Sequence, residues 1–113
     1  MNLTDAISVH VTWKLALHHA VRTGVATNLD PALLGRSDRC ELGLWLARPT
    51  TRFEGLEELR DLHGRFHAVA GALIHRIQDH GSGAATRDLE AELADLSARL
   101  VVRLGAAAQA LDP

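Results

Sequence analysis

The feature that most constrains the fold is a helical spacing of apolar residues near the end of the chain. Between residues 85 and 110, leucine and alanine recur three or four positions apart, with Arg and Glu outside the repeat. This spacing puts the apolar side chains on one side of an α-helix. The stripe consists of Leu89, Leu93, Leu96, Leu100, Leu104, Ala107 and Leu111. We therefore expect a long helix over residues 85–110, with Thr86 as its cap.

A second helix is predicted over residues 4–23. Thr4 or Asp5 can cap its start, and Gly24 lies where such a helix would stop. His10 falls on the apolar stripe of this segment. This histidine is therefore expected to face the core.

A third helix is predicted over residues 55–79. Thr51 and Glu54 have the spacing of a capping box just before it. His63 lies on its apolar face and His67 lies beside that face, one helical turn further on. Two more histidines are thus expected at core-facing positions.

The connection between the first and third helices is predicted to contain two shorter elements. Asp30 followed by Pro31 is typical of a helix start and predicts a single turn there. A short helix over residues 38–47 is expected to carry Cys40 in its first turn, where a helix N-terminus lowers the pKa of a thiol. No segment shows the period-two alternation of a strand. The predicted fold is all-α, an antiparallel four-helix bundle with a short extra helix carrying the cysteine.

Length and charge limit the class of protein. A chain of 113 residues is expected to form a single domain, 1–113. The net charge of −2, with both signs interleaved, gives no reason to expect a nucleic-acid partner. No signal peptide and no uncharged run of membrane-spanning length is visible, so we expect no membrane partner. A lone cysteine without an export signal favours a reducing cytoplasm.

The cysteine and three histidines suggest a metal site. His63 and His67 can direct both imidazoles to one point, which leaves two tetrahedral corners for other elements. His10 and Cys40 could fill those corners and complete a closed zinc site of one cysteine and three histidines. Each feature alone is weak evidence, because seven histidines produce such spacings by chance and a lone cysteine is often a small buried hydrophobe. The combination favours a metal, since three unpaired buried imidazoles would be costly.

These residues also carry a family resemblance. The motifs H-x-x-W at His10, C-x-L-G-x-W at Cys40 and H-x-x-x-H at His63 occur in that order over roughly residues 7–80. In this respect the chain resembles the chemoreceptor zinc-binding (CZB) domain family. The resemblance implies four zinc ligands, namely His10, Cys40, His63 and His67. It also implies that three signature residues support the cysteine, namely Leu42, Gly43 and Trp45. Gly43 has no side chain, so a neighbouring helix or the metal-bearing loop is expected to approach closely there. Three side chains are expected to anchor the short helix, namely Leu42, Leu44 and Trp45.

The resemblance implies a cytoplasmic sensory or regulatory module in signal transduction, such as chemotaxis. Four protein ligands leave no open position for water or substrate, so an enzyme is not expected. The module would respond to zinc or to oxidants such as hypochlorous acid, because a zinc-bound thiolate at Cys40 is the redox-reactive form. Members of the family are usually attached to a chemoreceptor or a diguanylate cyclase, and these are the signalling partners that the resemblance implies.

Three alternatives stay open at this point. A di-iron bundle would also use helix histidines, but it needs carboxylates one turn from them on inward faces. Neighbours such as Leu59 and Leu17 are apolar instead, and Lys14 follows His10 by four. A zinc buffer or chaperone would share the four ligands. A structural adaptor bundle would bind no metal at all. We further predict a homodimer, because the leucine stripe of the last helix could be partly buried against a second copy.

The remaining histidines and the acidic run are expected to be solvated. We predict surface or flank positions for four histidines, namely His18, His19, His75 and His80. We predict a solvated acidic face at Glu54, Glu57, Glu58 and Asp61.

Overall fold

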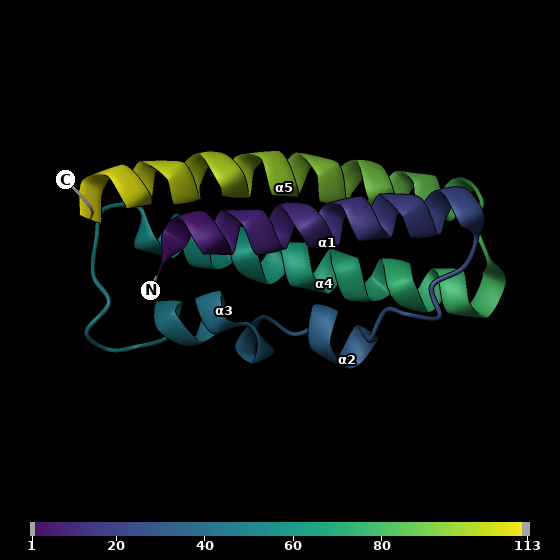
Figure 1. Ribbon diagram of the computed structural model, residues 1–113, viewed down its shortest axis with the longest axis horizontal. Coiled ribbons are helices and arrows are strands. Elements are labelled where there is room, and N and C mark those ends of the chain that lie inside the picture. Colours follow the sequence, from purple (N-terminus) through teal and green to yellow (C-terminus); the bar gives the residue numbers. More distant parts are fainter. Residues whose placement is uncertain (1, 112–113) are drawn as a thin grey trace.

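A computed structural model describes residues 2–111 of the protein. Three long helices make up most of it, and a series of short helical segments connects the first long helix to the second (Figure 1). No strand occurs within these described residues, so the prediction of an all-α fold is confirmed. In chain order the elements are α1 (Leu3–Thr23), α2 (Pro31–Leu34), η1 (Ser37–Arg39), α3 (Glu41–Leu46), α4 (Leu56–His80) and α5 (Ala84–Leu111).

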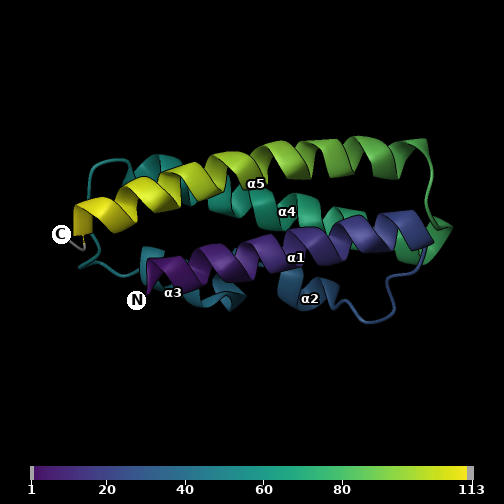
Figure 2. The ribbon, with the colours of Figure 1, turned by 45° about the horizontal axis from the view of Figure 1, so that its top comes forward.

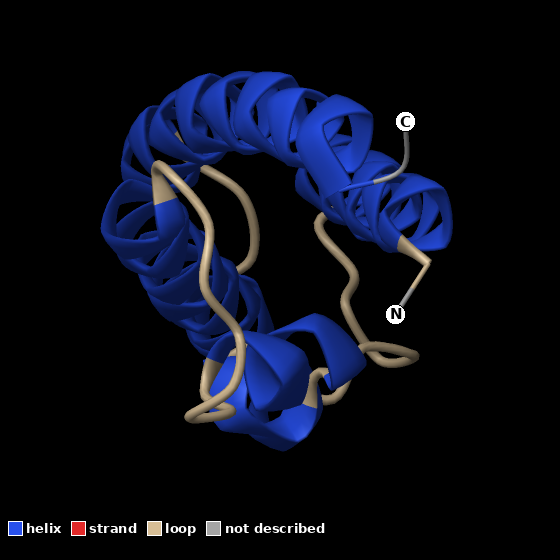
Figure 3. Cartoon of the chain, turned by 90° about the vertical axis from the view of Figure 1, so that its left-hand side faces the viewer, coloured by secondary structure: helices blue, strands red, loops and turns tan. Residues whose placement is uncertain are grey.

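The elements form an antiparallel helical bundle. Helices α1 and α4 run in the same direction, and α5 runs back along both of them (Figures 1 and 2). The short segments α2, η1 and α3 run back along the remaining side, so together they occupy the second position of an up-down-up-down bundle. Viewed along the bundle, the three long helices form an arc that the short segments close (Figure 3). The bundle that the sequence predicts is present, with its second member broken into pieces.

The start of α1 is one residue earlier than predicted. Asn2, and neither Thr4 nor Asp5, is the N-cap, because its Oδ1 atom accepts a hydrogen bond from the backbone N–H of Asp5 at 3.1 Å. The predicted stop at Gly24 is confirmed. This residue adopts a left-handed conformation with φ of 73°, which glycine tolerates best.

The start of α4 contradicts the predicted capping box. Helix α4 begins at Leu56 after Gly55, whose φ of 89° belongs to the left-handed region. Thr51 does not cap the helix, because its hydroxyl donates a hydrogen bond to the carbonyl oxygen of Trp45 at 2.7 Å. The side chain that was expected to cap the start of α4 therefore stabilises the end of α3.

The start of α5 also differs from the prediction. The helix begins at Ala84, and Thr86 lies inside its first turn. The Thr86 hydroxyl reaches back to Gly83, where it accepts from the backbone N–H at 2.7 Å and donates to the carbonyl oxygen at 2.8 Å. Thr86 thus stabilises the start of α5 from within the helix and is not its cap.

The segment around the cysteine is broken where a continuous helix was predicted. The single turn after Asp30 is present as α2, and the Asp30 side chain accepts from the N–H of Ala32 at 2.9 Å. Between η1 and α3, however, Cys40 is extended, with φ of −94° and ψ of 139°. Cys40 therefore precedes α3 as its N-cap residue and does not lie in the first turn of a helix.

The core is mainly aliphatic and is shared by all three long helices. The leucine stripe of α5 points inward: Leu93, Leu96, Leu100 and Leu104 are buried within this chain, while Leu111 at its end is 45% exposed. This stripe therefore builds the bundle itself. None of the helices described over residues 2–111 combines the length and the apolar character that crossing a membrane requires.

Candidate metal centre

The structure brings together all four side chains that the sequence predicts as ligands. His10 lies on α1, Cys40 lies just before α3, and His63 and His67 lie one turn apart on α4. One potential ligand atom from each lies within 4.8 Å of the others. All four residues are buried, and Cys40, the most accessible, is only 5% exposed. Elements that are far apart in the chain thus converge on one buried point.

The spacing of these atoms fits a tetrahedral metal ion. The Nε2 atom of His10 lies 3.6 Å from the Sγ atom of Cys40, and the Nε2 atoms of His63 and His67 are 3.1 Å apart. Around a tetrahedral zinc ion with bonds of about 2.0 to 2.3 Å, neighbouring donors are roughly 3.3 to 3.8 Å apart. The two pairs already lie close to this spacing, so the residues fit the ion.

Two of the imidazoles are held from outside the cluster by backbone carbonyl groups. The Nδ1 atom of His10 lies 2.7 Å from the carbonyl oxygen of Ala6, and the Nδ1 atom of His67 lies 2.7 Å from that of Leu34. Because a carbonyl oxygen can only accept, each Nδ1 carries the hydrogen and each Nε2 carries a lone pair. Both lone pairs face the cluster, which is the arrangement that metal-binding histidines usually have.

The other two potential ligand atoms, Nε2 of His63 and Sγ of Cys40, each carry a hydrogen in this arrangement. Since Nε2 of His67 is an acceptor, the N–H of the 3.1 Å contact belongs to His63. By the same argument the thiol of Cys40 donates to Nε2 of His10. A metal bound here would need both of these hydrogens to move.

Burial sets the protonation of the four groups. Burial lowers the pKa of His10 to about 4, and burial together with the neighbouring His67 and His10 lowers the pKa of His63 to about 3. The pKa of His67 is also lowered by burial, against the effect of its bond to Leu34. The three imidazoles are therefore neutral near pH 7, the form in which they bind metals.

The thiol contradicts the expectation drawn from helix geometry. Burial raises the pKa of Cys40 and outweighs the hydrogen bonds from the backbone of Gly43 and Leu42, which lower it. The negative charge of Glu41 raises it further. Without a cation beside it, this cysteine is therefore a thiol and not a thiolate.

Aromatic rings surround the imidazoles. The ring centre of Trp13 lies 5.0 Å from that of His10 and 5.5 Å from that of His67. Phe66 lies at 5.3 and 5.4 Å from the same two rings and is fully buried. These edge contacts explain the tryptophan of the H-x-x-W motif, which shields the cluster from water.

Gly43 allows the cysteine segment to approach the cluster. A Cβ atom at this position would lie 1.7 Å from the carbonyl oxygen of Ser37 and 3.1 Å from Cε1 of His63. The predicted close approach is therefore present. Of the expected anchors, Leu42 is buried and Trp45 stacks on Phe53, with ring centres 5.7 Å apart.

One further anchor proposed from the sequence is wrong. Leu44 is 57% exposed and points away from the bundle, because α3 is short and only one side of it meets α4. The buried leucines of α3 are Leu42 and Leu46.

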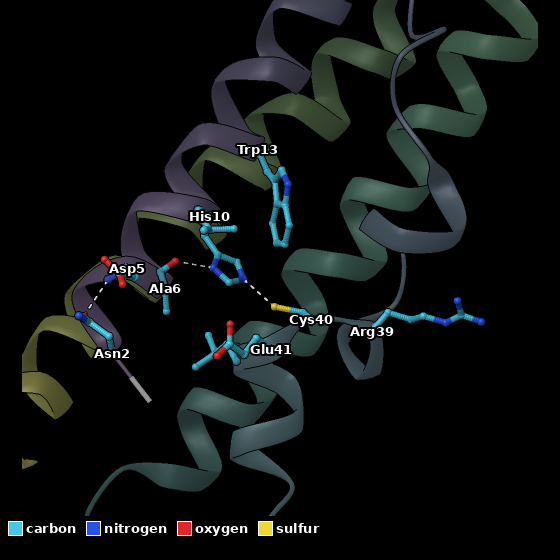
Figure 4. Close-up of a pocket in the computed structure, with 10 residues that line it drawn as sticks. Asn2, Asp5, Ala6, His10, Trp13, Arg39, Cys40 and Glu41 are labelled. Carbon is cyan, nitrogen blue, oxygen red and sulfur yellow. Dashed lines mark hydrogen bonds between the residues drawn. The ribbon is translucent and has the colours of Figure 1, made fainter.

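A pocket opens beside the cysteine. It has a volume of about 240 Å³ and lies between the first half of α1 and the segment from Arg39 to Leu42. Figure 4 shows the His10 ring and the Cys40 sulfur next to each other on its wall, with the Trp13 ring directed toward them. The pocket thus lies on the His10 and Cys40 side of the cluster.

The remaining candidate groups are at the surface, as predicted. The four other histidines are exposed, and His18 contacts Glu90 of α5. Three members of the acidic run form surface ion pairs, Glu57 with Arg60, Asp61 with Arg65 and Glu58 with Arg103. Within residues 2–111 these groups do not gather into a second cluster of potential ligands.

Some contributors to the site were missed from the sequence. The carbonyl groups of Ala6 and Leu34 orient two imidazoles, and no residue type marks a carbonyl in a sequence. Gly35 and Gly71 bring α2 onto α4, where a Cβ atom at Gly71 would lie 2.8 Å from the Cα atom of Gly35. A weak signal existed for Gly71, since a glycine inside a periodic helix often has a packing reason. Gly64 interrupts the same helix without one, so the sequence could not tell the two apart.

Comparison with known proteins agrees with this geometry. No curated protein and no solved structure gives a match to the chain. The family model described as the chemoreceptor zinc-binding domain matches residues 10–74, which is more than half of the 113 residues. The matched region includes all four clustered side chains. The chain therefore belongs to the chemoreceptor zinc-binding domain family.

Proposed function

We propose that the protein is a regulatory module that binds one Zn²⁺ ion through His10, Cys40, His63 and His67. The observation that carries the proposal is the convergence of four buried donors, two of which are oriented by backbone carbonyl groups. One thiolate and three neutral imidazoles form a donor set that suits zinc. Family membership supports the same ion.

The proposed role is regulatory because four protein donors complete a tetrahedral site. A catalytic zinc keeps one position for water or substrate, whereas a structural one does not. When bound, the ion would stabilise the thiolate of Cys40 and join α1, α3 and α4 at one point. Metal binding and packing of the short segments would then be coupled.

We further propose that Cys40 is the oxidant-sensitive group. The pocket of about 240 Å³ beside it could admit a small neutral molecule such as hypochlorous acid. The thiolate sulfur would attack the reagent, an S–O bond would form and chloride would leave with its electron pair, giving a sulfenic acid. Because α3 has only six residues, loss of the sulfur anchor would free it from the bundle. This movement is the proposed signal.

Metal analysis of protein purified without a histidine tag tests zinc binding. We expect about one zinc per chain, and a loss of zinc in His63→Ala and in His67→Ala. His75→Ala is the matched control, because His75 is exposed on the same helix. Substoichiometric metal after zinc supplementation would contradict the proposal.

Mass spectrometry of oxidant-treated protein, run beside a zinc-release dye, tests the redox role. Hypochlorous acid should oxidise Cys40 and release zinc, and Cys40→Ser should lose this response. If Cys40 stays reduced while the single methionine is oxidised, the redox proposal fails and a role in sensing or buffering zinc is left.

The wider setting is also a proposal. We expect residues 1–113 to act as one domain in the cytoplasm, as part of signalling through a chemoreceptor or a diguanylate cyclase. We also propose a homodimer. Since the leucine stripe of α5 is buried within the chain, the contact would have to use exposed apolar side chains such as Val102, which is 68% exposed.

A further inference from the structure

The two anchored histidines differ in where their anchors come from. His10 bonds to the carbonyl group of Ala6, four residues earlier on the same helix, so this anchor forms whenever α1 forms. His67 bonds to the carbonyl group of Leu34, which lies in α2, 33 positions before His67 in the chain. The orientation of His67 therefore depends on where α2 lies.

Helix α2 cannot fix its own position. It is a single turn of four residues, Pro31–Leu34, and a helix of that length has no stability of its own in water. It packs along α4 at the side of the bundle (Figures 1 and 2). Whatever holds α2 against α4 therefore also places the acceptor for His67.

Helix α2 is held there by the buried side chain of Leu34, and two glycines allow the close approach of α2 to α4. Gly35 directly follows Leu34, and Gly71 lies one turn beyond His67 on α4. A Cβ atom at Gly71 would lie 2.8 Å from the Cα atom of Gly35, and one at Gly35 would lie 3.2 Å from the Cα atom of Gly71. The atom in the way of a methyl group at Gly71 belongs to the backbone and cannot rotate aside. The methyl group could therefore be accommodated only if α2 moved away.

We infer that Gly35 and Gly71 are positioning residues for His67, a role that rests on the zinc-binding function proposed above. A methyl group at Gly71 would displace α2 by about half an ångström or more, because packed backbones have no free space to absorb it. The 2.7 Å bond from Nδ1 of His67 to Leu34 would then lengthen or break. The ring would lose both its fixed tautomer and its direction toward the cluster.

Zinc affinity of Gly71→Ala tests this inference, with Gly64→Ala as the matched control. Both substitutions add one methyl group to α4, but nothing lies within 4 Å of a Cβ atom at Gly64. In competition with a chelator we expect Gly71→Ala to bind zinc about 10- to 100-fold more weakly than the unmodified protein. Gly64→Ala should stay within about twofold of it.

A spectroscopic measurement separates this role from a general loss of stability. Nitrogen-detected NMR of the histidine rings should show a hydrogen on Nδ1 of His67 in the unmodified protein and in Gly64→Ala, protected from exchange with solvent. In Gly71→Ala that protection should be lost, while the Nδ1 hydrogen of His10 should remain, because its anchor lies within α1.

The outcomes are distinguishable. If the unmodified protein binds no zinc, the proposed function fails by itself. If it binds zinc and Gly71→Ala binds equally well with the His67 hydrogen still protected, the inference is overturned. If Gly71→Ala fails to fold, the same NMR measurement on the zinc-loaded unmodified protein decides. A hydrogen on Nε2 of His67, in place of one on Nδ1, would overturn the inference.

Discussion

The Sγ atom of Cys40 lies 3.6 Å from the Nε2 atom of His10, although the two residues are 30 positions apart in the chain. The Nδ1 hydrogen of His10 is used by the carbonyl group of Ala6, so the contact is a hydrogen bond from the thiol to the imidazole. The hydrogen thus lies between two atoms that would both bind a metal. Metal binding at this point must remove it.

We therefore predict that zinc binding near pH 7 releases about one proton per chain. The proton comes from Cys40, because burial raises the pKa of its thiol, while the low pKa values of His10 and His63, about 4 and about 3, leave these rings neutral. Isothermal titration calorimetry in buffers of different ionisation enthalpy measures this number.

Cys40→Ser is the comparison for this measurement. Its hydroxyl gives up its hydrogen far less readily, so both the proton release and the affinity should fall. Two results together would show that Cys40 is not a ligand. The unmodified protein would bind zinc without releasing a proton, and Cys40→Ser would bind zinc with the same affinity.

Acid should destabilise the metal-free protein. His10 and His63 have folded-state pKa values of about 4 and about 3, below their unfolded value of 6.5. As the pH falls below about 6.5 the unfolded chain takes up protons that the folded chain cannot, at up to about 1.4 kcal/mol per pH unit for each histidine. The decrease in the free energy of unfolding ends near the folded-state pKa values. Urea unfolding of chelator-treated protein should therefore give a free energy about 2 to 4 kcal/mol lower at pH 5 than at pH 7.

A neutral replacement measures the share of one histidine. His63→Gln should remove about half of this pH dependence, because His10 still contributes. His75→Gln, at an exposed position on the same helix, is the matched control. Equal stability of the metal-free protein at both pH values would mean that the cluster is open to water.

Gly43→Ala should destabilise the bundle and weaken zinc binding together. The new Cβ atom would lie 1.7 Å from the Ser37 carbonyl oxygen, so α3 must shift, at a cost of about 3 kcal/mol or more. The shift also moves the segment that carries Cys40. Thermal unfolding and metal content measure the two effects.

Gly105→Ala is the control for this substitution. Nothing lies within 4 Å of a Cβ atom there, so the alanine should stabilise α5 by up to about 1 kcal/mol and leave zinc binding unchanged. A Gly43→Ala protein as stable as Gly105→Ala would contradict the packing argument.

The proposed homodimer makes a prediction about Val102. Its side chain is 68% exposed on α5, so Val102→Glu should cost the monomer little. It should shift a dimer toward monomer if this face is the contact. Sedimentation at tens of micromolar measures the effect, and a monomer in the unmodified protein refutes the dimer outright.

The sequence by itself determined the helical class and the order of the long helices. Apolar positions three and four apart report which face of a helix is buried, and this information is complete within each segment. The same periodicity put His10, His63 and His67 at core-facing positions, and the structure brings these rings together with Cys40. The family motifs are likewise local, and the family they indicate is confirmed.

The tertiary structure alone decided how the cluster is held. The capping box at Thr51 failed because the Trp45 carbonyl group competes for its hydroxyl, a contact between segments that the local pattern does not contain. The thiol pKa of Cys40 is raised and not lowered, because desolvation depends on what packs around the sulfur. The acceptor for His67 is the carbonyl group of Leu34 on α2. Every residue has a carbonyl group, so this one is selected by the packing of α2 on α4, where Gly35 meets Gly71. Residue types thus specify which groups can bind, and packing between distant segments decides how they are oriented and protonated.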